Sequence, residues 1–371
     1  MINQEEVPTR VVHIITTLDH GGAEKQLLES LMHFPRTYQC QVFWIKGPGT
    51  LQSTFLSKKI LASPLRGNLR AFIKLMLSGK FQREHNFAKK PLIIHAHLPR
   101  AELVGVIVAK MFRLPLIVSK HNSEAMWPRG NPTISRLLAG VVYSSSAKVI
   151  CISKTVYQYL DGIGELPRKS AKVEIVHYGI DLSHFNEGTI EREISRIVPR
   201  IGTLSRYTPQ KQLETLILAA KELEREGLKV EFECHGEGQE KARLHELVET
   251  LGLESSVKLL GKILDADDFI RDCDIFVLTS KYEGFGLVIL EAIRNHVPIL
   301  ISNSEAAREV LLDNQDLLFN IGDYLQLAAK IKGLISRKDL YSRNIKISTD
   351  LAKRFDINRT VKELIRIYES I

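Results

Sequence analysis

Short apolar runs rich in β-branched residues alternate with segments of helical apolar spacing along the whole chain. Runs of this kind, bounded by glycine, proline and polar residues, predict buried strands. In the first half they lie at 11–17, 41–46, 91–97, 116–122 and 147–153, and in the second half at 200–206, 229–238, 257–261, 273–280 and 297–302. This alternation predicts an α/β fold with two Rossmann-like domains, whose boundary falls near residues 183–195.

One stretch, residues 281–292, combines several chemical features. It follows the predicted strand 273–280, turns at Glu283–Gly286 and enters an apolar helix from Leu287 that contains Glu291. Glycines at the start of a helix let a ligand approach backbone N–H groups, which favours phosphate. A buried carboxylate such as Glu291 needs sugar hydroxyls or a cation as partner. The residues alone leave a structural ion pair at Glu291 and a solvated Glu283 equally open.

Two further turns join a predicted strand to a helix. Gly21 and Gly22 follow the first strand, without the GxGxxG spacing of a dinucleotide site. Arg206 and Lys211 flank a polar turn before the helix that starts at Leu213, where two cations and free amides suit a diphosphate. The alternatives are glycines that serve only a tight turn and two solvated surface cations.

Polar side chains also follow two strands of the first half. His97 and His121 end the runs 91–97 and 116–122, and the carboxyl ends of parallel strands form the ligand-binding edge of such sheets. The two imidazoles are therefore expected to converge, although a single histidine is more often structural. Lys120, Asn122 and Arg129 lie at the same strand end or in the loop after it, where an acceptor pocket is expected.

Composition narrows the class of protein. With 371 residues, 44% of them hydrophobic and 25% charged, the chain suits two globular domains, and no run of 18 apolar residues spans a membrane. The four cysteines form no CxxC pair, and the N-terminal segment lacks a signal-peptide layout, so a reducing, cytoplasmic location is expected.

The net charge of +8 is unevenly distributed. Residues 1–190 hold 24 lysines and arginines against 13 acids, which indicates an anionic partner such as a membrane face, a lipid phosphate or an acidic glycan. No nucleic-acid motif is found. The stretch 58–90 carries nine basic residues and one acid; its apolar positions fit either a helix lying on an anionic membrane or, as we favour, an ordinary helix packed on the sheet.

The segment EGFGLVILEA, residues 283–292, resembles the signature of retaining glycosyltransferases of family four, which have the GT-B fold. The segments GGAEKQLLESL, HAHLPRAEL, VSKHNSE and GTLSRYTPQKQLETLILAA are similar to further parts of that family, so the resemblance spans nearly the whole chain. Several positions depart from the family pattern: among them, Tyr178 replaces an asparagine, Gln212 and His296 replace glycines, and Gln239 replaces a proline.

The resemblance implies an acceptor-binding domain over 1–185 and a donor-binding domain over 186–356, facing across a cleft, with the helix 357–371 packed back on the first. It places His121 and Glu283 at the reacting sugar and Glu291 on the nucleotide ribose. The remaining implied donor contacts are Gly21, Gly22, Arg206, Lys211, Gly284, Phe285, Gly286 and Leu287, with His97 on the acceptor side.

The implied activity is metal-independent transfer of a sugar from a nucleotide-sugar to a glycan or lipid-linked acceptor, by front-face attack with retention. No cofactor is expected, and a cytoplasmic location is expected. The excess of basic residues in the first half also predicts contact with the inner face of the membrane. A nucleotide-sugar epimerase, a phosphorylase-like enzyme and a catalytically silent nucleotide-sugar-binding protein are the alternatives.

Overall fold

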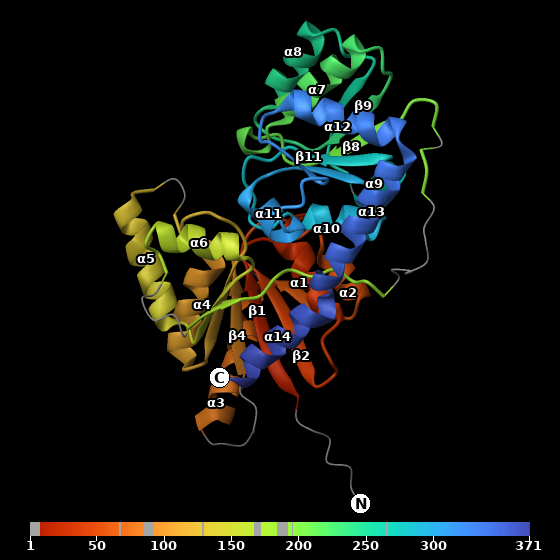
Figure 1. Ribbon diagram of the computed structural model, residues 1–371. Coiled ribbons are helices and arrows are strands. Elements are labelled where there is room, and N and C mark those ends of the chain that lie inside the picture. The colour runs from red at the N-terminus through yellow and green to blue at the C-terminus, as the bar shows by residue number, and fades with distance from the viewer. Residues whose placement is uncertain are drawn as a thin grey trace, which may run out of the picture. The chain divides into compact units, whose positions relative to one another are not determined.

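The computed structural model describes residues 8–66, 68–84, 92–127, 130–166, 172–183, 192–194, 196–263 and 266–371. The chain forms two compact units (Figure 1). The first contains residues 1–181 and 357–371, and the second contains residues 182–356. The C-terminal helix α14 (Ile357–Glu369) thus belongs to the first unit.

The first unit is built on a seven-stranded parallel sheet in the order β3-β2-β1-β4-β5-β6-β7. Its strands are β1 (Thr9–Ile15), β2 (Tyr38–Trp44), β3 (Leu61–Pro64), β4 (Leu92–His97), β5 (Leu116–Lys120), β6 (Lys148–Cys151) and β7 (Val173–Ile175). The helices between them are α1 (Gly22–Met32), α2 (Gln52–Ser57), α3 (Leu69–Glu84), α4 (Pro99–Phe112), α5 (Pro132–Ser145) and α6 (Lys154–Gly162).

Alternate residues of these strands face two different helix layers, because side chains point to opposite faces with a period of two. Val12 and Ile14 of β1 pack in one core with side chains of α3, α4 and α5. Val11 packs on the other face with Ile367 and Tyr368 of α14, which crosses the strands in Figure 1. His13 therefore lies on the sheet face that α14 covers. The side chains of His95 and His97 of β4 lie on the same face.

The second unit has a six-stranded parallel sheet in the order β10-β9-β8-β11-β12-β13. Its strands are β8 (Arg200–Leu204), β9 (Glu231–His235), β10 (Val257–Leu260), β11 (Ile275–Leu278), β12 (Ile299–Ser302) and β13 (Leu318–Phe319). Its helical segments are η2 (Pro209–Lys211), α7 (Leu213–Arg225), α8 (Lys241–Thr250), α9 (Ala266–Asp272), α10 (Leu287–Arg294), α11 (Glu305–Leu311), α12 (Tyr324–Ser336), α13 (Lys338–Ala352) and η3 (Lys353–Phe355).

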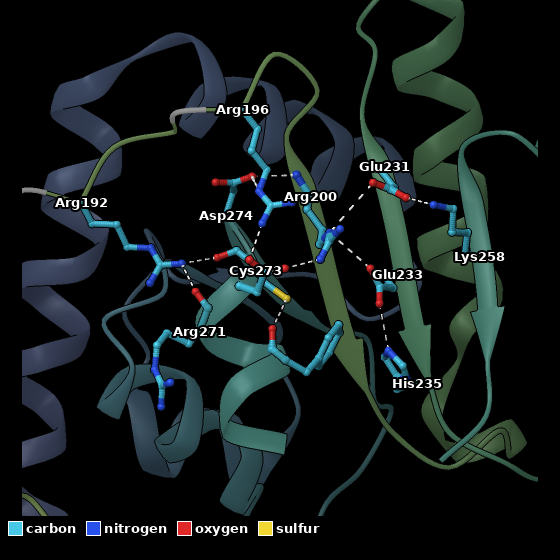
Figure 2. Close-up of polar contacts among 12 residues, drawn as sticks. Arg192, Arg196, Arg200, Glu231, Glu233, His235, Lys258, Arg271, Cys273 and Asp274 are labelled. Atoms are coloured by element: carbon cyan, nitrogen blue, oxygen red, sulfur yellow. Dashed lines mark hydrogen bonds and ion pairs between the residues drawn. The ribbon is translucent and has the colours of Figure 1, made fainter. Parts of the chain in front are cut away.

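Arginines before and at the start of β8 attach this strand to the end of α9 (Figure 2). Arg192 donates to the backbone carbonyls of Arg271 at 2.6 Å and Cys273 at 2.5 Å, which are orphan acceptors at a helix C-terminus. Arg200 pairs with Glu233 of β9 at 3.2 Å, and its backbone N–H donates to Asp274 at 2.8 Å. These contacts fix the start of β8, whose other end carries the turn with Arg206.

The predicted strands are confirmed, with ends that differ by a few residues, whereas β3, β7 and β13 lie outside the ten apolar runs. Within the basic stretch 58–90, β3 and α3 are formed by residues 61–64 and 69–84, whereas residues 67 and 85–90 lie outside the described residues. Phe72 and Met76 of α3 are buried in the core, as the packing interpretation predicts, although Ile73 and Leu77 are exposed. Among the described residues, no helix has the length and apolarity needed to cross a membrane.

Candidate functional site

The glycine turn after β11 presents a helix N-terminus in the second unit. Gly286 adopts a φ of 84°, in the left-handed region that favours glycine, and precedes the first residue of α10. Phe285 is buried and its ring meets that of Phe355 edge-on at 5.4 Å. The aromatic side chain thus anchors the turn inward, and the amides at the start of α10 are suited to an anion.

The turn that carries Lys211 is bound to the same segment. The Thr279 hydroxyl donates to the Lys211 carbonyl at 2.6 Å, and the Gln210 amide donates to the Tyr282 carbonyl at 2.8 Å. These bonds bring the Lys211 ammonium to the Glu283 carboxylate, and the two form an ion pair. Two residues predicted from different motifs are therefore neighbours in one unit, and neither is a freely solvated side chain.

Arg206 lies on the exposed side of this turn and, within the described part of the chain, pairs with no carboxylate. The turn is held by close backbone approach. A Cβ on Gly236 would lie 1.8 Å from the Ser205 carbonyl oxygen. The Tyr207 hydroxyl below it is buried and donates to the Leu260 carbonyl at 2.7 Å. Position 236 therefore requires glycine for steric reasons.

Glu291 lies in α10 and is 5% exposed, so the burial predicted from its apolar helix is observed.

The two residues that replace family glycines, Gln212 and His296, keep the turns that glycine would make. Gln212 adopts a φ of 45° directly before α7, and His296 adopts a φ of 52° after α10. Both residues accept the left-handed backbone, which costs about 1–2 kcal/mol for a residue with a Cβ.

In the first unit, the predicted histidines His97 and His121 do converge. His97 Nδ1 lies 3.0 Å from His121 Nε2, and His97 Nε2 lies 3.0 Å from His13 Nδ1. His121 Nδ1 bonds the hydroxyl of Tyr178. Four side chains from β1, β4, the end of β5 and the segment after β7 thus form one continuous series, which we call the histidine chain (His13, His97, His121, Tyr178).

Beside it, His95 bonds the Tyr368 hydroxyl through Nδ1 and the Ser119 hydroxyl through Nε2, each at 2.7 Å. Burial lowers the pKa of His13 to about 3. Burial, and less strongly the Lys120 ammonium, lowers the pKa of His121 to about 3. The imidazoles are therefore neutral at pH 7, where each ring has one N–H donor and one acceptor.

Lys120 is buried at 2% exposure, with its ammonium 3.1 Å from the Glu102 carboxylate and above the Tyr143 ring at 5.8 Å. Burial is the largest single influence and opposes the charge, but the Glu102 carboxylate and the Tyr143 hydroxyl together outweigh it and raise the pKa of Lys120. This side chain is turned into the core, so it does not line an acceptor pocket as the sequence suggested. Asn122 is partly exposed, and Arg129 lies outside the described residues.

Gly21 precedes the first residue of α1, and Gly22 is that residue. A Cβ on Gly21 would lie 2.4 Å from Glu24 Oε2, whereas Gly22 faces open space. Glu24 is itself buried, accepts a hydrogen bond from the Thr17 hydroxyl at 2.6 Å, and has its pKa raised by burial. The strand–turn–helix prediction holds, and the contact of these glycines with a diphosphate stays a prediction.

Sequence reasoning did not single out His13 or Glu102, and it gave Tyr178 no role in the site. Two of the three carry a signal in the sequence. His13 is a polar residue in the apolar strand β1, and it lies on the same sheet face as His95 and His97 of the neighbouring strand β4. Glu102 is the one acid in the apolar helix α4. Tyr178 stands where the resemblance implies an asparagine, and its hydroxyl completes the histidine chain.

Comparison with known proteins covers nearly the whole chain. The model described as glycosyl transferases group 1 matches residues 191–350, and the model described as glycosyltransferase family 4 matches residues 20–184. The capsular polysaccharide biosynthesis glycosyltransferase CapH of Staphylococcus aureus is 22% identical over 369 residues, 97% of this chain and 99% of CapH. The putative glycosyltransferase EpsD of Bacillus subtilis is 29% identical over 300 residues, 75% of this chain and 76% of EpsD.

Solved structures share the fold. HepE of Anabaena in complex with UDP has a TM-score of 0.79 and 20% identity, covering 98% of this chain and 100% of HepE. A glycosyltransferase of Rickettsia africae has a TM-score of 0.76 and 17% identity, covering 98% of each chain. The predicted fold of two α/β domains with parallel sheets is thereby confirmed.

Proposed function

Because the chain belongs to the group 1 glycosyltransferases, we propose that it moves a sugar from a nucleotide-sugar to a glycan or lipid-linked acceptor with retention of the anomeric configuration. UDP is the first nucleotide to test, because HepE was solved with UDP and with UDP-glucose. The acceptor class follows from relatives named for polysaccharide and lipopolysaccharide biosynthesis.

The observation that carries the proposal is the Lys211–Glu283 pair beside the N-terminus of α10. An ammonium has three N–H donors, so Lys211 can bond Glu283 and diphosphate oxygens together. The carboxylate then lies next to the sugar carried by that diphosphate. Arg206 and the N-terminus of α10 add positive potential where the leaving group gains charge.

In this mechanism the acceptor hydroxyl attacks on the side from which the diphosphate departs, and a donor phosphate oxygen takes its proton. The chain then needs no base of its own and no paired carboxylates of the glycosidase type. Glu283 is proposed to hold sugar hydroxyls rather than to form a bond to the sugar, and His121 is proposed to contact the sugar. Arg206 and Lys211 supply the charge that a metal provides elsewhere, so we propose transfer without a metal ion.

We also propose that the first unit contacts an anionic membrane through α4 and α5, which pack side by side. Their exposed apolar side chains are Ile107, Met111, Ile134, Leu137 and Val141. The one acid on these helices, Glu102, is buried, while Lys110 and Arg136 are exposed. Apolar side chains among cations and no exposed acid suit the interface of an anionic bilayer, where a lipid-linked acceptor would lie.

The donor proposal is tested by the thermal midpoint of the chain with UDP, GDP, ADP and their sugars, with a chelator present. A ligand of the native state raises the midpoint by mass action, and we expect a selective shift with one nucleotide. Retention is then read from the anomeric configuration of the product. No shift with any nucleotide would favour a catalytically silent scaffold protein without a donor site, and turnover of the donor to another nucleotide-sugar without acceptor would identify an epimerase.

Two substitutions separate binding from turnover. Glu291→Ala should weaken nucleotide binding, because the removed carboxylate is proposed to bond the ribose. His121→Ala should lower kcat more than nucleotide affinity, because the ring is proposed to contact the sugar. Lys221, on the exposed face of α7 and paired with Glu224, provides a control, since Lys221→Ala should change neither quantity. Unchanged kinetics in both site variants would disprove the assignment.

A further inference from the structure

The histidine chain leaves each of its inner rings without a free nitrogen. His97 bonds His13 and His121, and His121 bonds His97 and the hydroxyl of Tyr178. A neutral imidazole donates through one nitrogen and accepts through the other. Each ring therefore passes the hydrogen bond on in one direction, and all the protons of the histidine chain must point the same way.

Two proton arrangements satisfy this condition. In the first, the Tyr178 hydroxyl donates to His121, His121 donates to His97, and His97 donates to His13, whose Nε2 carries a proton. In the second, every proton between the rings is reversed and His13 Nε2 is an acceptor. The arrangement determines which nitrogen of His121 bears its proton.

The end of the histidine chain lies in a cavity of about 40 Å³. Among the described residues, His13 Nε2 and the side-chain oxygen of Gln26 are buried atoms without a partner, and both residues line this cavity. The space is large enough for a water molecule, which needs about 10–15 Å³. One water bonded to both atoms satisfies them in either proton arrangement.

A metal ion is the other occupant that buried histidines suggest, because His13, His95 and His97 bring ring nitrogens within 4.8 Å of one another. However, His95 uses both nitrogens on Tyr368 and Ser119, and His97 uses both on other histidines. Only His13 Nε2 remains for a cation, whereas zinc binds through at least three protein ligands. The hydrogen bonds therefore favour water.

We propose that His13, His97 and Tyr178 are positioning residues for His121, which fix its ring and select the nitrogen that carries its proton. The inference rests on the proposed function, in which His121 contacts the donor sugar. A sugar hydroxyl that bonds a ring nitrogen of His121 must replace the Tyr178 hydroxyl or the His97 ring. Tyr178, at a position where the resemblance implies asparagine, thereby influences how His121 meets the sugar.

Two tyrosines provide a matched test. Tyr178 and Tyr368 are both buried, and each places its hydroxyl on a histidine ring, but only Tyr178 belongs to the histidine chain. In NMR spectra of the full-length protein with ¹⁵N-labelled histidine, Y178F should shift the ring signals of His121 and His97. Y368F should shift those of His95 and leave His121 unchanged.

Kinetics supply the second measurement. Y178F should lower kcat for transfer about tenfold with the donor KM within about twofold, because a misplaced group loses orientation rather than binding. Y368F should keep the wild-type kcat. Equal loss of kcat in both variants would overturn the proposal and indicate a structural role, as would unchanged His121 and His97 signals in Y178F.

If Y178F does not fold, His13→Gln tests the other end and should shift the ring signals of His97 and His121. Titration with Zn²⁺ tests the cation: shifts of His13, His95 and His97 at stoichiometric zinc would overturn the water-ended chain. The NMR measurement requires no sugar transfer. A protein without transferase activity that still shows the predicted ring shifts would disprove the proposed function and leave the hydrogen-bonded chain in place.

Discussion

At the residue scale, the buried histidines make the first unit sensitive to acid. Burial is the main cause that lowers the pKa of His13 to about 3, and it lowers those of His95 and His97 well below 6.5. A group with a depressed folded-state pKa contributes stability above its unfolded pKa and loses it as the pH falls. Each such histidine should therefore lower the free energy of unfolding by about 1 kcal/mol per pH unit between pH 6 and 5.

Both tryptophans, Trp44 and Trp127, lie in the first unit, so urea unfolding followed by their fluorescence reports on that unit alone. His13→Gln should reduce the slope of stability against pH by the share of one histidine. His20→Gln provides the control, because His20 is exposed on the loop after β1 and should keep the wild-type slope. An unchanged slope in His13→Gln would show that its ring is charged in the folded state.

Residue types at strand ends were predictable, but their partners were not. His97 and His121 follow from two strands that end in polar residues, and the structure brings them together. Lys120 was placed with them because it is polar and adjacent, yet it turns inward to Glu102. A sequence shows that a charged residue ends a strand. Only the packing of α4 on the sheet shows that the Glu102 carboxylate lies on the buried side of that residue.

At the element scale, the start of α10 depends on one backbone conformation. Gly286 has a φ of 84°, and a Cβ there would lie 2.8 Å from Ile289 Cδ1. Gly286→Ala should therefore raise the free energy of α10 by about 1–2 kcal/mol, from the left-handed backbone alone. Hydrogen exchange of the α10 amides should become about tenfold faster for each 1.4 kcal/mol, by the usual relation of free energy to an equilibrium constant.

Gly22→Ala is the matched control, because Gly22 also begins a helix but has no close neighbour and no left-handed backbone. It should leave the exchange of the α10 amides unchanged and affect α1 by less than about 1 kcal/mol. Unaltered α10 exchange in Gly286→Ala would mean that the turn adopts another conformation, and the proposed anion seat at Leu287 would lose its support.

The strands of the structure differ in how well the sequence predicts them. A buried strand such as β11, with the sequence IFVL, was predictable because it is a continuous apolar run. The short strands β3 and β13 were not, because LASP and the two-residue LF carry too little pattern. The turn at His296 could not be predicted either, since a histidine is an uncommon residue at a φ of 52°, and only the structure shows that the turn is kept without glycine.

At the scale of the whole molecule, the excess of basic residues in the first half of the chain contributes to the surface that α4 and α5 form on the first unit. Ile107 and Leu137 are 60% and 70% exposed on α4 and α5, among exposed cations. We expect the protein to sediment with vesicles that contain anionic lipid and to remain in solution with zwitterionic ones, because juxtaposed cations contribute about 1 kcal/mol each at an anionic surface. High salt should weaken the binding, since it screens these charges.

The apolar contribution is tested by the double substitution Ile107→Ser and Leu137→Ser, which should lower vesicle affinity at least about tenfold, as expected when two large side chains no longer enter the interface. Leu325→Ser is the control, because Leu325 is exposed on α12 of the second unit and outside this surface. Equal binding of the double variant and the wild type would leave the cations as the only attraction. Equal binding to both kinds of vesicle would exclude an electrostatic contact and would indicate that the basic half of the chain serves an acidic glycan instead.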